Sequence, residues 1–163
     1  MAIELGELRE YLDGGEIRFS VGGKQYAHAP SAQTVLQFQA EYREALAEPS
    51  RMTNFQLWKW GAQLLGGDFD KDTQGLSGGI LDELVADGVD HPSLDRVFNA
   101  VIIAHWHSND AALTYFKTGD VGKALGVTEK QIEAAVKKAA EKAAAKEEEA
   151  PAEEAPAEKK PKA

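Results

Sequence analysis

Near the N-terminus of this chain, polar and apolar residues alternate, as they do in a strand that is half-buried. Ile17, Phe19 and Val21 fall on one side of this extended segment. Gly22-Gly23 can adopt the positive φ angles of a tight turn, and residues 24–26 would form the return strand. The pattern therefore predicts a β-hairpin, and no other segment gives a good hairpin signal.

Apolar residues at helical spacing, ended by glycine or proline, predict helices through the rest of the chain. A short helix is expected before Gly14. Further helices are expected to start near Asn54 and at Ile80. Three more should each follow an N-cap residue, which is Ser31, then Ser93 or the residue before it, then Ser108. The segment with the widest apolar face is expected to be the central helix. The apolar faces carry Val35, Phe38, Tyr42 and Leu46; Phe55, Leu57, Trp58, Leu64 and Leu65; Ile80, Leu81, Leu84 and Val85; and Leu94, Val97, Phe98, Val101, Ile102 and Trp106.

The C-terminal region changes character, which sets the expected domain organisation. Residues 139–146 contain only alanine, glutamate and lysine, and the segment that follows is punctuated by proline. We expect a helical core domain with the hairpin over residues 1–126, an exposed helix over 127–149 and a disordered tail over 150–163. The fold class is mainly α (α+β), and Thr128 and Gln131 have the spacing of a helix capping box.

Charge and composition narrow the function classes. The 163 residues carry a formal net charge of −9, which repels phosphate backbones and disfavours nucleic acid as a partner. The chain has no cysteine, which removes disulfides and thiolate chemistry. No apolar run approaches the roughly 20 residues that cross a bilayer. We expect a cytoplasmic protein without a membrane partner.

The segment DFDKDTQGLSGG, residues 68–79, resembles part of a calcium-binding loop. Aspartates stand at its first, third and fifth positions, but the sixth is Thr73 where an EF-hand has glycine. The twelfth is Gly79, which has no carboxylate to complete the site. The sequence favours a flexible acidic loop between two helices, with weak calcium binding as the alternative.

Other candidate sites are weaker. His105 and His107 are two residues apart and would point to different sides of a helix, so we predict no metal site there. Neither a phosphate-binding glycine motif nor a nucleophile elbow is present, so we predict no enzyme, no catalytic residue and no cofactor. Residues 120–138 have the form of a helix-turn-helix, and a small DNA-binding regulator is the alternative function.

Two stretches resemble the tail assembly chaperones of long-tailed phages that infect actinobacteria. One is GGKQYAHAPSAQTVLQFQA (residues 22–40), and the other is LLGG (64–67) followed by ILDELVADGVDHPSLDRVFNAVIIAHWHSNDAALTYFKTGD (80–120). The likeness spans about residues 15–125. The loop over residues 67–79 is longer than the family pattern.

The resemblance implies a non-enzymatic role in the host cytoplasm. Such chaperones bind the tape measure protein, help recruit tail tube subunits and are absent from the mature virion. A longer form made by programmed frameshifting is a further implied partner, and Lys159-Lys160 stands near the end of the chain, where the family expects the frameshift site.

Candidate partner-binding residues are the large aromatic side chains of two helices, which could form a surface for a client helix. These residues are Phe55, Trp58, Trp60 and Phe116. Because Trp58 and Trp60 are two apart on a helix, they should not both face the core, and we expect Trp60 to be partly exposed.

Overall fold

In the computed structural model, which describes residues 15–148, the N-terminal hairpin forms as the alternation predicts. β1 (Ile17–Val21) and β2 (Lys24–His28) are antiparallel, with Phe19 opposite Tyr26. These two rings are buried and stack with their centroids 5.4 Å apart. The hairpin therefore buries one aromatic pair and leaves its other face polar. The helix predicted before Gly14 and the tail predicted over residues 150–163 lie outside the described residues.

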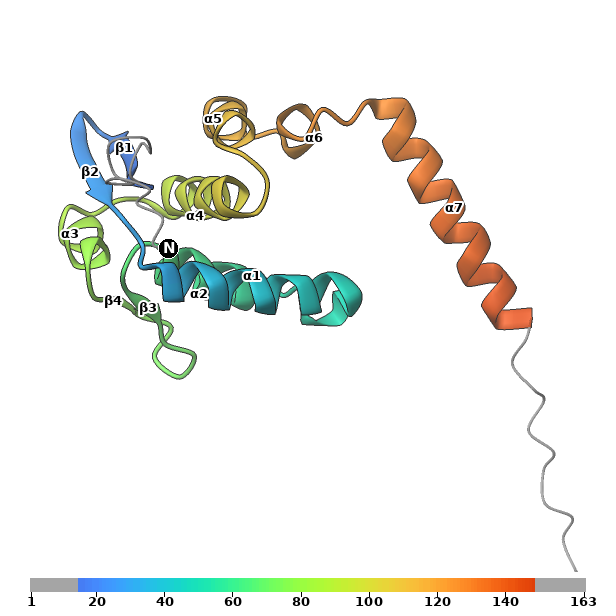
Figure 1. Ribbon diagram of the computed structural model, residues 1–163, viewed down its shortest axis with the longest axis horizontal. Coiled ribbons are helices and arrows are strands. Elements are labelled where there is room, and N and C mark those ends of the chain that lie inside the picture. Colours follow the sequence, from blue (N-terminus) through green and yellow to red (C-terminus); the bar gives the residue numbers. More distant parts are fainter. Residues whose placement is uncertain (1–14, 149–163) are drawn as a thin grey trace, which may run out of the picture. The chain divides into compact units, whose positions relative to one another are not determined.

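Helices make up most of the described chain, so the mainly α class with a small hairpin is confirmed (Figure 1). A short 3-10 turn, Pro49–Arg51, follows the first helix. The helices are α1 (Ala32–Ala47), α2 (Asn54–Leu64), α3 (Ile80–Ala86), α4 (His91–Trp106), α5 (Asn109–Thr118), α6 (Val121–Ala124) and α7 (Glu129–Glu148).

Helix starts follow the capping residues, with one correction. The hydroxyls of Ser31 and Ser108 accept hydrogen bonds from main-chain N–H groups three residues on, as predicted. The prediction that α4 is capped at Ser93 or the residue before it is wrong. The cap is Asp90, whose Oδ1 accepts from the Ser93 N–H at 2.8 Å. Pro92 then stands in the first turn, where its missing N–H costs nothing.

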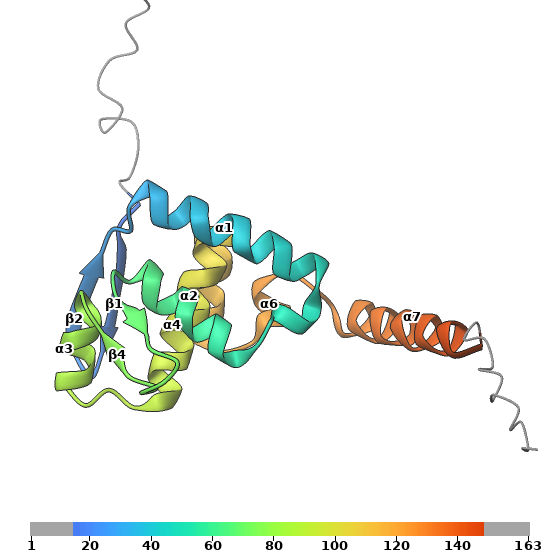
Figure 2. The ribbon, with the colours of Figure 1, turned by 90° about the horizontal axis from the view of Figure 1, so that it is seen from below.

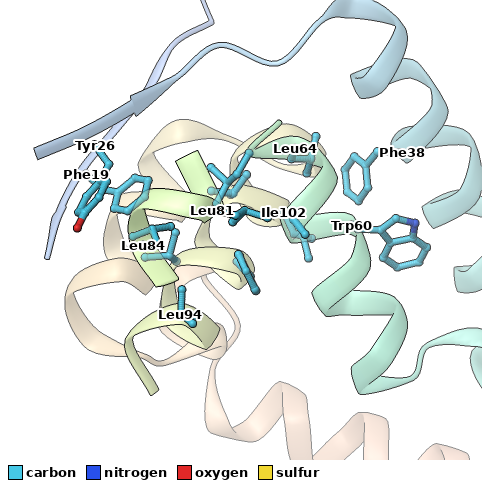
Figure 3. Packing of buried hydrophobic residues seen from close by; sticks show 14 of the residues in the cluster. Phe19, Tyr26, Phe38, Trp60, Leu64, Leu81, Leu84, Leu94 and Ile102 are labelled. Carbon is cyan, nitrogen blue, oxygen red and sulfur yellow. The ribbon is translucent and has the colours of Figure 1, made fainter. Parts of the chain in front are cut away.

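α4 is the central helix, as its wide apolar face predicts. It contacts α1, α2, α5 and β1 (Figure 2). The core runs from the hairpin, through Leu84 and Leu94, to the aromatic cluster at Phe38 and Trp60 (Figure 3). The side chains that α4 itself buries are Leu94, Val97, Phe98, Ala100, Val101 and Ile102.

Two apolar residues assigned to buried faces are exposed instead. Leu46 at the end of α1 and Val85 in α3 both face solvent. α1 contacts the core through Phe38 and Ala45, which leaves Leu46 beyond the contact. α3 is seven residues long and packs against the core through Leu81 and Leu84, which leaves Val85 in solvent.

The acidic segment between α2 and α3 is a second small hairpin, where the sequence predicted a loop. β3 (Asp68–Phe69) pairs with β4 (Leu76–Ser77) in antiparallel register. Phe69 packs against Phe55 and Trp58, which anchors the hairpin to α2. With two residues in each strand, this hairpin is too short to produce a readable alternation.

The glycines after α2 let the chain turn tightly under β4. Gly66 has a φ of +84°, which favours glycine, and a Cβ on it would meet His28 at 2.5 Å. A Cβ on Gly67 would meet the main-chain oxygens of Ser77 and Gly78. The two glycines therefore allow the end of α2 to pass directly against the segment that starts α3.

The described chain divides into two units at Leu125–Gly126, and α7 belongs to the second unit. Thr128 and Gln131 form the predicted capping box: the Thr128 N–H donates to Gln131 Oε1 at 2.9 Å. Of the helices in the described range, none has the length and apolarity to span a membrane.

Candidate polypeptide-binding groove

A groove of about 720 Å³, lined by both apolar and polar groups, lies in the first unit between β1, α4 and α5. Figure 1 shows β1 on the side of the hairpin that is nearer to α4 and α5, while β2 lies beside α3. The lining residues are Gly15, Glu16, Ile17, Arg18, Phe19, Val97, Ala100, Val101, Ala104, His105, Asn109, Ala112, Leu113 and Phe116.

The α4 wall is built from small and branched side chains. Val97 and Val101 are one helical turn apart, and Ala100 and Ala104 repeat the same spacing beside them. The alanines leave room above the helix, because a methyl group does not fill the space between α4 and its neighbours. The groove therefore exists because one side of the most apolar helix carries small residues.

The α5 wall presents one large apolar side chain to solvent. α5 buries Ala111, Ala112 and Tyr115. Leu113 is 52% exposed, whereas Phe116 lies one turn after Ala112 and is half-buried against the core. An exposed leucine at the rim of an apolar groove adds surface that a partner could remove from water.

Three polar side chains that line the groove, Glu16, Arg18 and His105, have hydrogen-bond partners. Arg18 Nε donates to Glu16 Oε2 at 2.7 Å, and the two charges compensate each other. His105 Nδ1 lies 2.9 Å from the carbonyl of Val101. Across the described residues, every buried side-chain nitrogen or oxygen has a hydrogen-bond partner. A partner in the groove would therefore meet the apolar helix surface together with the polar side chain of Asn109.

Of the four aromatic residues predicted to bind a partner, the structure places Phe116 in the groove. Phe55 and Trp58 are half-buried beside β3, where both contact Phe69. Trp58 also donates its indole N–H to Asp95 Oδ1 at 2.9 Å and packs edge-on against Phe98. The structure does not bring these two residues to the groove.

The expectation that Trp60 is partly exposed is wrong, because Trp60 is 1% exposed. Its ring packs against Phe38 and Tyr42 of α1, and Figure 3 shows it beside Phe38. Trp58 is the more exposed of the two tryptophans. Both rings contact the core, because Trp58 packs against Phe98 while α1 covers the side of α2 that carries Trp60. Spacing alone could not show which of the two sides is more fully covered.

Sequence reasoning missed most of the groove. Val97 and Val101 were assigned to the core face, and the β1 residues were assigned to the hairpin alone. The available signal was Leu113 alone, an apolar residue that stands off the side of the helix carrying Ala111 and Tyr115.

The acidic loop uses its central aspartate for its own backbone. Asp70 Oδ1 accepts hydrogen bonds from the main-chain N–H groups of Asp72 and Thr73, both at 2.8 Å. These bonds hold the pKa of Asp70 below its ordinary value. No group of three or more histidine, aspartate or glutamate side chains that could hold a metal occurs among residues 15–148.

The predicted helix-turn-helix falls across the boundary between the two units. α6 has four residues and packs on α5. α7 begins after Gly126, whose φ is +67°, and belongs to the second unit. The two helices exist in the predicted order, and the described contacts of α6 are with α5.

The chain is a mainly α protein with a β-hairpin and a groove between β1, α4 and α5. The chain belongs to the family described as a domain of unknown function, DUF7426, whose model matches residues 6–158. Comparison with curated proteins gave no match, and comparison with solved structures gave none.

Proposed function

We propose that this protein is a phage tail assembly chaperone that holds a segment of the tape measure protein in the groove between β1, α4 and α5. The observation that carries the proposal is the groove itself, apolar on its helical walls and rimmed by the half-exposed Leu113. The resemblance of residues 15–125 to tail assembly chaperones supplies the class of client.

A groove with apolar helix surface on a strongly charged body suits transient holding of another polypeptide. Burial of apolar surface drives the association, and the cost of ordering the partner offsets much of that free energy, which keeps the complex reversible. The net charge of −9 opposes self-association of the free chaperone. The protein would act in the host cytoplasm, help recruit tail tube subunits, perform no catalysis and be absent from the mature virion.

The test is co-expression with the tape measure protein of the same phage. The chaperone should keep the tape measure protein in the soluble fraction and co-purify with it. Leu113→Glu, which puts a charge on the groove rim, should reduce the soluble tape measure protein severalfold. Leu46→Glu is the matched control, because Leu46 is 50% exposed but lies on α1, outside the groove.

Three results would contradict the proposal. The first is failure of the unmodified chaperone to retain soluble tape measure protein. The second is an equal loss with Leu113→Glu and Leu46→Glu, which would detach the activity from the groove. The third is a stoichiometric amount of the chaperone in purified virions, measured by mass spectrometry.

A further inference from the structure

β1 pairs with β2 on one side, and its other edge is open among the described residues. Gly22 and Gly23 have φ of +58° and +84° and form a two-residue turn. In such a hairpin the residues that flank the turn exchange hydrogen bonds, and every second residue along the strand repeats this pattern. The main-chain N–H and C=O groups of Arg18 and Ser20 therefore point away from β2.

The open edge faces the groove. The first three residues of β1, Ile17–Phe19, line it together with the two residues before the strand. Because neighbouring side chains in a strand point to opposite faces, a cavity that contacts three strand residues in a row borders the strand's edge, and Ser20 continues that edge beyond the lining. Beyond the hairpin, the main chain of Arg18 and Ser20 makes no hydrogen bond with another described residue.

The groove thus has a strand edge on one side and apolar helices on the other. A strand added beside β1 would lie about 4.8 Å from it. Alternate side chains of that strand would then face Val101 on α4 and Leu113 on α5. Main-chain hydrogen bonds give such an addition affinity, and alternate side chains give it selectivity.

We infer that the edge of β1 binds an extended segment of the client by strand addition, a refinement that rests on the proposed function. The segment would have apolar residues at every second position and lysine or arginine between them. The chain's net charge of −9 favours a basic segment. The same charge disfavours a second copy of this chain as the occupant.

The experiment uses the full chain and a fluorescent ten-residue peptide in which valine alternates with lysine and threonine. A second peptide has the same sequence with every second amide N-methylated on the edge that would pair with β1. We expect the first peptide to bind by anisotropy, and the methylated peptide to bind at least about tenfold more weakly. The amides of Arg18 and Ser20 should gain protection from hydrogen exchange in the complex.

A protein variant gives an independent test. Arg18→Pro removes the outward N–H from an edge position that tolerates proline, and it should weaken peptide binding. Arg18→Ala, which keeps that N–H, should not. Circular dichroism checks that both variants fold, and the methylated peptide keeps the proposal testable if Arg18→Pro does not.

Several outcomes would overturn strand addition. These are no binding of the alternating peptide, equal binding of its methylated form, or a β1-mediated dimer of the chaperone. Retained tape measure solubility without peptide binding would reject strand addition and leave the proposed function standing. If the peptide binds but the chaperone does not keep the tape measure protein soluble, the proposed function is rejected and strand addition at β1 still stands.

Discussion

The indole Nε1 of Trp60 donates a hydrogen bond to Oε2 of Glu41 at 2.7 Å, inside the aromatic cluster that joins α1 and α2. The bond satisfies the polar edge of a ring that is otherwise fully enclosed. It also explains how a glutamate can face the core: its carboxylate accepts from Trp60 and from Gln37, which lies on the outer side of α1. Burial of this tryptophan therefore depends on a residue from another helix.

Removing either partner of this contact should destabilise the protein. Trp60→Ala should lower the free energy of unfolding by about 3–5 kcal/mol, because it leaves a large cavity. Glu41→Ala should cost about 1–3 kcal/mol, because it leaves the buried indole N–H without an acceptor. Urea unfolding followed by circular dichroism measures both. Glu41→Gln keeps an acceptor and should cost less than Glu41→Ala; equal losses would contradict the assigned role.

The contact between the N-terminal hairpin and the end of α3 should make stability depend on pH. Asp87 Oδ2 accepts from Lys24 Nζ and from the Tyr26 hydroxyl, both at 2.6 Å. These hydrogen bonds, from Lys24 first, hold the pKa of Asp87 below its ordinary value. A depressed folded-state pKa means that this stabilisation is present above the unfolded-state pKa and is lost as pH falls through the folded-state pKa.

Unfolding free energies measured from neutral pH down to about pH 3 should therefore fall below about pH 4. The fall should be smaller in Asp87→Asn, which cannot lose that charge. Asp110→Asn is the control, because the Asp110 carboxylate has no hydrogen bond to a described residue. If Asp87→Asn retains the full acid sensitivity of the unmodified protein, the contact does not have this role.

Gly61 should be intolerant of alanine although it lies inside a helix. Alanine normally favours a helix interior by up to about 1 kcal/mol over glycine. Here a Cβ would meet Cβ of Phe98 at 2.5 Å and its Cα at 3.0 Å, so α2 and α4 would have to separate. We expect Gly61→Ala to lower stability by about 1–3 kcal/mol. A gain in melting temperature in Gly61→Ala would contradict this close approach of α2 and α4 at Phe98.

The acidic hairpin should depend on one oxygen of Asp70. Asp70→Asn keeps an Oδ1 that accepts from the Asp72 and Thr73 N–H groups, and it should preserve the β3–β4 turn. Asp70→Ala removes these bonds and should increase hydrogen exchange at both amides. Exchange read by nuclear magnetic resonance compares the two variants. Similar protection in both would mean that the turn does not need the carboxylate.

Calcium provides a separate measurement on the same loop. Because Asp70 Oδ1 is already bound to the backbone and Gly79 offers no carboxylate, we expect millimolar calcium to leave the melting temperature unchanged. Magnesium at the same ionic strength is the control. A calcium-specific rise that disappears in Asp72→Asn would establish a metal site in this loop.

The elements of this protein could be predicted from sequence because their signals are local. Alternation around Ile17–Val21, serine hydroxyls three residues ahead of an N–H, and glycine at helix ends depend on contacts within a few residues. The same locality explains the misplaced start of α4, where Asp90 and Ser93 are both capable capping residues. A two-residue strand such as β3 leaves too few positions for any pattern.

The sequence by itself determined the mainly α class, the N-terminal hairpin, the central position of α4 and the capping box before α7. Tertiary structure alone decided that Trp60 is enclosed and that Leu113 is left at a groove. The physical reason is that periodicity gives the apolar sides of an element but not the neighbour that covers each side. Coverage is set by packing between residues far apart in the chain, as between Phe38 of α1 and Trp60 of α2.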